Sequence, residues 1–220
     1  MKEIKILLLY PPEQTWPGYM CKPNGSLAYP YLGGALRDIG VTVDVYDACV
    51  GNDKDNLDDF FNKSTPLPSG MMRTGVKDER ILEVVSQYDA VGITSIFSQQ
   101  ETQVLHCAKI IKKNYPDKIL FSGGVNAKSR SSIFFAAGFD VIFTSESEVV
   151  IQEIAKILQN GKEDFSYDII LRTHLVIFVA TEEVHYRKKT ALCTHILYGI
   201  VGKYIPKKDL KFCVFTCKFY

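Results

Sequence analysis

The sequence lacks an excess of charge of either sign, and it lacks a long apolar run. Lys and Arg number 26 against 25 Asp and Glu, for a net charge of +1, so the basic surface typical of nucleic-acid-binding proteins is not expected. The apolar run from Ile4 to Tyr10 is too short to cross a membrane, and Pro11 and Pro12 end it. We therefore expect no nucleic-acid partner, no membrane partner and a cytoplasmic location. The six cysteines, with no secretion signal before them, are expected to be reduced.

Several motifs of nucleotide-binding and signalling domains are also missing. No Gly-x-Gly-x-x-Gly follows the first apolar run, which argues against a dinucleotide site, and no Gly-x4-Gly-Lys-Ser/Thr occurs, which argues against a nucleotide hydrolase. A phosphoacceptor receiver would need acidic residues after its first strand and an aspartate at the end of its third. Those positions read Tyr10-Pro11-Pro12 and Thr94-Ser95 instead.

Apolar segments of strand length alternate with segments of helical periodicity through residue 160. The pattern predicts strands at 4–9, 41–46, 90–96, 118–122 and 140–144. It predicts helices at 27–39, 78–87, 101–114, 131–137 and 149–158, with a short one at 57–61. Right-handed crossovers then give an α/β fold, a flavodoxin-like (Rossmann-type) doubly wound five-stranded parallel sheet of order 2-1-3-4-5.

Residues 1–160 are thus expected to form one domain, and residues 161–220 an atypical C-terminal tail. In the tail the alternation stops, basic residues outnumber acidic ones, and three of the four histidines occur. Residues 169–180 have strand-like apolar content, but the pattern assigns them no place in the sheet.

In such a sheet, ligands bind beyond the carboxyl ends of the strands, where the winding reverses. The hydroxyls of Thr94 and Ser95 could bind a ring nitrogen, an amide or a phosphate there. The alternative is purely local, with Ser98 capping the next helix and Glu101 completing a capping box. Gly123-Gly124 fits either a close approach to a ligand or a simple tight turn. Carboxylates at 146 and 148 are expected to stabilise a helix N-terminus rather than to form a catalytic pair.

Taken in order, six stretches resemble the N-terminal cobalamin-binding domain of cobalamin-dependent radical S-adenosylmethionine enzymes. They span about 150 residues and comprise 6–12, 26–36, 43–48, 88–95, 120–125 and 138–148. The resemblance implies a flavodoxin-like domain that holds the corrin ring and the nucleotide tail of cobalamin. The cofactor-binding residues that it implies are Tyr10, Pro11, Pro12, Thr94, Ser95, Ile96, Gly123, Gly124, Val125, Ser145 and Glu146.

The chain departs from related patterns at two positions within the domain. It lacks the Asp-x-His-x-x-Gly motif that supplies a cobalt-ligating histidine in mutase-type cobalamin domains, which leaves the lower cobalt ligand open. It also has Ser145-Glu-Ser-Glu148 where the family has Gly-Glu-Gly-Glu, which removes backbone freedom beside the expected ligand.

The tail contains part of the motif that binds an iron–sulfur cluster in this family. Cys213 and Cys217 have the Cys-x3-Cys spacing, but the third cysteine position is Tyr220, a poor substitute for a thiolate ligand. The resemblance therefore implies a truncated or diverged relative that binds cobalamin without catalysis on its own and holds no cluster. A zinc site from Cys193, His195, Cys213 and Cys217 is a weaker alternative to unligated thiols.

Two other functions fit the predicted fold. One is a cofactor-free interaction module, whose protein partner the sequence does not identify. The other is a flavodoxin that binds flavin mononucleotide, but that class expects a short hydroxyl-rich phosphate loop after the first strand. The proline-containing loop after Tyr10 is long and fits it poorly.

Overall fold

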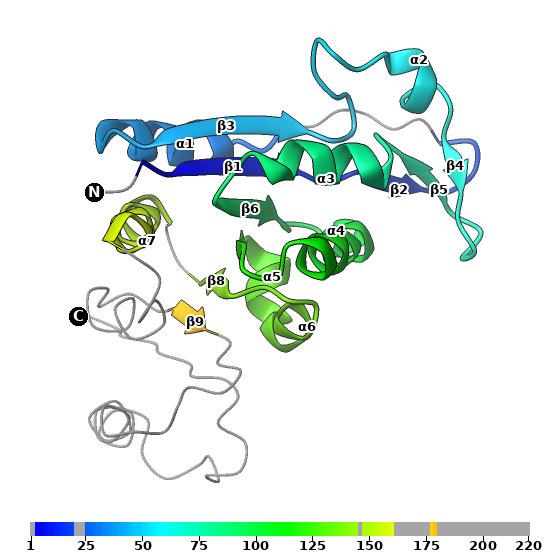
Figure 1. The fold of residues 1–220 in the computed structure, drawn as a ribbon. Helices are drawn as coiled ribbons and strands as arrows, with labels where there is room; N and C mark the ends of the chain where they lie inside the picture. Colours follow the sequence, from blue (N-terminus) through cyan, green and yellow to red (C-terminus); the bar gives the residue numbers. More distant parts are fainter. Residues whose placement is uncertain (1–2, 20–24, 145–146, 161–176, 180–220) are drawn as a thin grey trace, which may run out of the picture.

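A computed structural model describes residues 3–19, 25–144, 147–160 and 177–179. Its main sheet has the strand order β3-β1-β6-β7-β8-β9 (Figure 1). The strands are β1 (Lys5–Tyr10), β3 (Thr42–Asp47), β6 (Ala90–Thr94), β7 (Ile119–Gly123), β8 (Val141–Phe143) and β9 (Ile177–Val179). The first five are parallel, and their order is the flavodoxin-like order expected from the sequence.

The sixth strand, β9, differs from the expectation for the tail. It pairs antiparallel with β8, with Val141 opposite Val179 and Phe143 opposite Ile177. Part of the 169–180 segment therefore has a place at the edge of the main sheet. Periodicity within one segment does not reveal that place, because the neighbour of an added edge strand is set by tertiary pairing.

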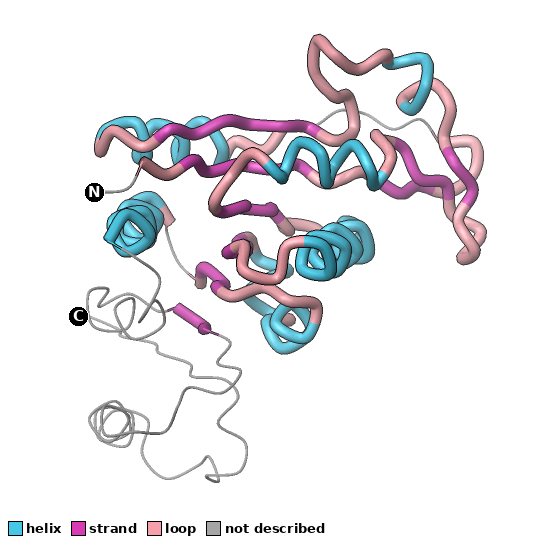
Figure 2. Tube along the Cα trace, viewed as in Figure 1, coloured by secondary structure: helices cyan, strands magenta, loops and turns pink. Residues whose placement is uncertain are grey.

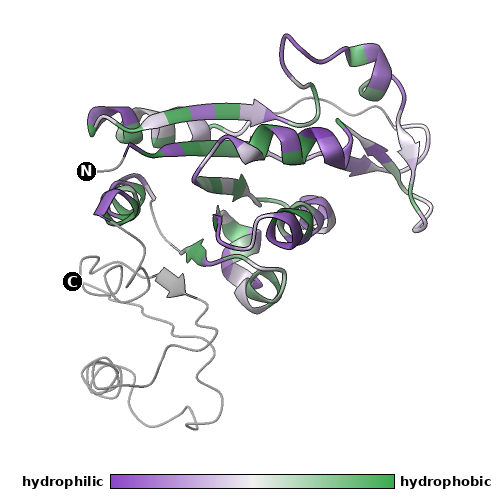
Figure 3. Cartoon of the chain, viewed as in Figure 1, coloured by the Kyte–Doolittle hydropathy of each residue, from purple (hydrophilic) through white to green (hydrophobic). Residues whose placement is uncertain are grey.

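Two helical layers bury both faces of the parallel strands. Helices α1 (Ala28–Asp38) and α7 (Glu148–Asn160) share one core with Ile6 and Leu8 of β1. Helices α3 (Asp78–Ser86), α4 (Glu101–Asn114) and α6 (Ser131–Ala136) share the other with Leu7 and Leu9. These four β1 side chains are fully buried, as expected for a central parallel strand. Figure 3 shows the resulting apolar colouring of β8 and much of α7.

A second, smaller sheet lies beyond the end of β1. It is antiparallel, has the order β2-β5-β4, and consists of β2 (Glu13–Thr15), β4 (Thr65–Pro66) and β5 (Met72–Thr74) (Figure 2). Its strands come from the loop after β1 and from the connection between β3 and α3, which also contains α2 (Leu57–Phe60). The strands have two or three residues each, too few to show an alternating pattern in the sequence.

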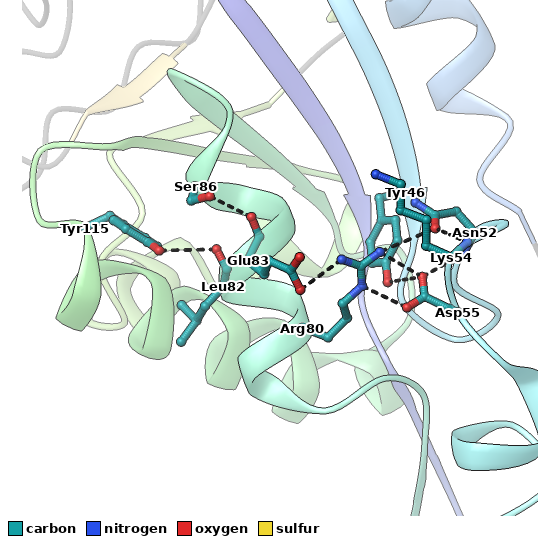
Figure 4. A network of polar contacts seen from close by, with 9 residues as sticks. All are labelled: Tyr46, Asn52, Lys54, Asp55, Arg80, Leu82, Glu83, Ser86 and Tyr115. Atoms are coloured by element: carbon teal, nitrogen blue, oxygen red, sulfur yellow. Dashed lines mark hydrogen bonds and ion pairs between the residues drawn. The ribbon is translucent and has the colours of Figure 1, made fainter.

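The connection between β3 and α3 is fixed by an ion pair. Nε of Arg80 on α3 lies 2.8 Å from Oδ1 of Asp55, and Asp55 Oδ2 accepts hydrogen bonds from Tyr46 and from the amide of Asn52 (Figure 4). Glu83 pairs with the same guanidinium at 3.0 Å. Burial raises the pKa of Asp55, but the hydrogen bonds from these partners outweigh it and hold the pKa below the ordinary value.

The helices follow the sequence expectation with one addition. Helix α4 has the predicted bounds, whereas α5 (Val125–Ser129) was not predicted, because five residues give too little periodicity. Among the described residues, no helix combines the length and the apolar character needed to cross a membrane.

Candidate functional site

A cavity of about 140 Å³ opens at the carboxyl ends of β6 and β7, on the face of the sheet that α1 and α7 cover. The start of α1 forms one wall through Ala28, Tyr29 and Leu32, and Ser147 borders it just before α7. Most of its surface is apolar. An apolar cavity of about 150 Å³ can hold benzene, so this one has the size for a small flat ring system.

Two neighbouring strands carry glycine on the face of the sheet that lines the cavity. Gly92 of β6 and Gly123 of β7 both line it. A Cβ atom at Gly92 would overlap the ring of Phe121, which lies across that position. Phe121 packs on Phe143 with 5.4 Å between ring centroids, and the two rings form the far wall. The Phe121 ring thus occupies the space that the missing side chain of Gly92 leaves, and the cavity is bordered by this ring, by Gly123 and by the start of α1.

Gly124 holds the turn between β7 and α5 close to the end of β6. Its φ is +105°, and a Cβ there would lie 2.5 Å from the carbonyl oxygen of Ser95. That carbonyl accepts a hydrogen bond from the amide of Ala127 on α5. The double glycine therefore lets two chain segments approach closely at the cavity wall. Gly124, the second glycine, has a backbone conformation that other residues rarely adopt.

Tyr29 connects helix α1 to the ends of two strands. Its hydroxyl donates to the carbonyl oxygen of Leu9 at 2.5 Å and accepts from the amide of Thr94 at 3.3 Å. The side chain is 4% exposed, and burial raises its pKa, so the phenol stays protonated and can donate. No local pattern predicts these two contacts, because both partners lie far from Tyr29 in the sequence.

Ser95 and Thr94 have different surroundings although they are adjacent. Thr94 lines the cavity. The Ser95 side chain is fully buried and accepts a hydrogen bond from Asn126 Nδ2 at 3.0 Å. Asn126 also donates to Glu101, which pairs with Arg130 at 2.9 Å. Ser95 therefore belongs to a polar network that fastens α5 to α4.

The expected capping box at Ser98 and Glu101 does not form at the start of α4. Ser98 lies within a short 3₁₀ segment, η1 (Ser98–Gln100), and Gln100 turns back instead. Its Oε1 accepts from the amides of Ile96 and Phe97, and its Nε2 donates to the Tyr10 hydroxyl at 2.8 Å. The expectation is wrong because the 3₁₀ turn moves the start of the α-helix to Glu101.

The structure brings together four of the predicted site residues around the cavity: Thr94, Ile96, Gly123 and Gly124. It does not place Tyr10, Pro11, Pro12, Ser95 or Val125 in the lining. The two prolines turn away toward the smaller sheet, where the Pro11 carbonyl accepts from Cys49 Sγ and Pro12 packs under Gly75. Sequence reasoning missed Gly92, Phe121 and Phe143. Gly92 could have been found, since it precedes Thr94 by two residues and so faces the same side.

Ser145 and Glu146 lie outside the described residues, as do all four candidate metal ligands of the tail, Cys193, His195, Cys213 and Cys217. Within the described ranges no group of three or more His, Cys, Asp or Glu side chains could hold a metal ion. His106, the one histidine in those ranges, is on α4 with its Nε2 2.6 Å from Asp78.

Comparisons with known proteins find a similar sequence and similar structures. No family model matches the chain. Over 150 residues, 66% of its length, the chain is 25% identical to cytidylyl-2-hydroxyethylphosphonate methyltransferase of Streptomyces wedmorensis, and it spans 27% of that protein. A response regulator protein from Burkholderia multivorans has a similar structure, with a TM-score of 0.40, 10% identity and coverage of 73% of this chain and 99% of that one. By its own strand order the chain is an α/β protein with a flavodoxin-like sheet, and its sequence is distantly similar to that of a methyltransferase.

Proposed function

We propose that this chain binds cobalamin and that the base of the nucleotide tail occupies the cavity between β6, β7 and α1. The observation that carries the proposal is the position of the cavity. Four residues that the family resemblance selected, Thr94, Ile96, Gly123 and Gly124, border this one space. The similarity to a methyltransferase supports a role in which a cofactor carries a methyl group.

The dimensions of the cavity fit one part of the cofactor. About 140 Å³ of mostly apolar space can take the benzene-sized ring of the base, whereas a corrin ring is far larger and must stay outside. Phe97 and Val125 directly follow two lining residues, and 58% and 72% of their surface is exposed. They offer apolar area on which a large flat macrocycle can lie.

The described residues would bind and orient the cofactor rather than perform acid–base chemistry. Of the described residues that line the cavity, Tyr29 alone is ionisable, and its raised pKa keeps it neutral. When bound, cobalamin supplies a cobalt centre that can carry a methyl group. The protein contributes an apolar wall, which excludes water. It also contributes the backbone groups at the ends of β6 and β7.

The test is binding of hydroxocobalamin to the purified chain, measured by gel filtration and by titration of the corrin absorbance. Cobinamide, which lacks the nucleotide tail, is the matched ligand. We expect the protein peak to carry corrin absorbance, and cobalamin to bind at least about tenfold more tightly than cobinamide, since a buried ring contributes on this scale. A protein peak without corrin would refute the binding. Equal affinity for both ligands would refute the assignment of the cavity.

A further inference from the structure

Tyr29 occupies the point where the two central strands of the sheet separate. The pairing of β1 with β6 ends at Leu9 and Ile93, although β1 continues to Tyr10 beside β3. The Tyr29 hydroxyl bonds the Leu9 carbonyl at 2.5 Å and the Thr94 amide at 3.3 Å. A side chain of α1 therefore binds backbone groups of both strands at the point where they separate.

This insertion closes the usual binding crevice of a doubly wound sheet. Ligands commonly enter where the winding reverses, which here is between β1 and β6. The phenol fills that space, and it satisfies the two backbone groups that a ligand would otherwise contact. The open space lies one strand further along, above Gly92 and Gly123, and Tyr29 itself forms its wall on the β1 side.

We infer that Tyr29 is a selectivity residue that limits the size of the ring admitted to the cavity. The inference rests on the proposed function and names the ligand class more closely. The site accepts corrinoids whose tail carries a benzimidazole-sized base, and it rejects those with a larger fused base. The boundary is set by a ring held at its far end by two backbone hydrogen bonds, so the ring cannot swing aside without losing both of them.

The test compares two corrinoids, one with a benzimidazole base and one with a naphthimidazole base, on three proteins. These are the unmodified chain, Tyr29→Ala, and the control Tyr31→Ala. Tyr31 lies two residues further along α1 and is 67% exposed. The ratio of the two dissociation constants is the readout, because partial unfolding affects both ligands equally and cancels.

The unmodified chain and Tyr31→Ala are expected to prefer the smaller base at least about tenfold, the discrimination typical of a fixed apolar pocket. Tyr29→Ala should reduce this preference to near unity. An unchanged ratio in Tyr29→Ala overturns the inference while leaving cobalamin binding intact. Failure of the unmodified chain to bind either corrinoid overturns the proposed function and the inference with it. If Tyr29→Ala does not fold, Tyr29→Leu, which keeps apolar bulk but shortens the wall, is measured with the same expectation.

Discussion

The two adjacent glycines at the end of β7 should respond differently to the same substitution. Gly124 has a φ of +105°, and an added Cβ would lie 2.5 Å from the Ser95 carbonyl oxygen. Gly123 has no such constraint, since its nearest contacts would be Phe143 Cβ and Cδ2, both at 3.5 Å. Gly124→Ala therefore tests the backbone of the turn, and Gly123→Ala tests the space in the cavity.

The magnitudes follow from these contacts. At Gly124, a backbone conformation nearly restricted to glycine costs about 1–3 kcal/mol, and the overlap with the Ser95 carbonyl adds about 1–3 kcal/mol. We expect Gly124→Ala to lower the free energy of unfolding by about 2–6 kcal/mol, which lowers Tm by at least about 4 °C in a chain of this size. Gly123→Ala should change the free energy of unfolding by less than about 1 kcal/mol, because its methyl group makes ordinary contacts.

Urea and thermal unfolding followed by circular dichroism measure the first effect. The second is measured by hydroxocobalamin titration, in which Gly123→Ala should bind at least about tenfold more weakly, because its methyl group narrows the cavity. Gly34→Ala, at a helical position with no atom within 4 Å of the added Cβ, is the control for both measurements. The reasoning is refuted if Gly124→Ala is as stable as the unmodified chain, or if Gly123→Ala loses as much stability as Gly124→Ala.

Three further predictions concern polar and thiol groups. Asp55→Asn should lower the free energy of unfolding at pH 7 by about 1–2 kcal/mol, with the exposed Asp53→Asn as a neutral control. Because the folded-state pKa of Asp55 lies below 3.8, the stabilisation is complete above that value and the gap to Asp55→Asn should close as the pH falls through the folded-state pKa. Burial raises the pKa of the Cys107 thiol to about 12, so the folded protein should not react at this residue at pH 8. Peptide mapping after iodoacetamide treatment should find Cys107 modified only in urea. Modification without urea would contradict its burial. Asn126→Ala should lower the free energy of unfolding by about 1–3 kcal/mol, since it leaves Ser95 Oγ and Glu101 without their buried donor, and a chemical denaturation midpoint equal to that of the unmodified chain would contradict this network.

The sequence was a good guide to elements whose burial is regular. Central strands such as β1 and β6 were predicted from near-continuous apolar runs, because a parallel sheet covered on both faces requires apolar residues at most strand positions. The edge strand β3 is more polar, and its place after a helix and before a turn supported its prediction. Helices such as α4 were predicted from their periodicity. The smaller sheet and α5 were missed because their segments are short and polar. Their formation depends on pairing partners far away in the chain, and no local pattern records such partners.

The site was predictable in outline only. The rule that ligands bind at carboxyl strand ends selected Thr94 and the double glycine, which do line the cavity. The same rule cannot tell which of two adjacent side chains faces the ligand side, so Thr94 and Ser95 were grouped although they lie in different surroundings. The two hydrogen bonds of the Tyr29 hydroxyl were beyond reach, since they depend on how close α1 lies to strands β1 and β6.

The smaller sheet should behave as a separate cooperative unit in amide hydrogen exchange. Thr74 is the one fully buried position in its three strands, so little apolar surface opposes its opening. Its charged attachment to the helical layer is the ion pair between Arg73 and Asp78, at 3.1 Å, beside a hydrogen bond from Arg73 Nε to Gln103. Exchange of the β2 and β5 amides should therefore be fast relative to that of β1 and β6 and should accelerate with added salt, which weakens that attachment while the main sheet stays closed.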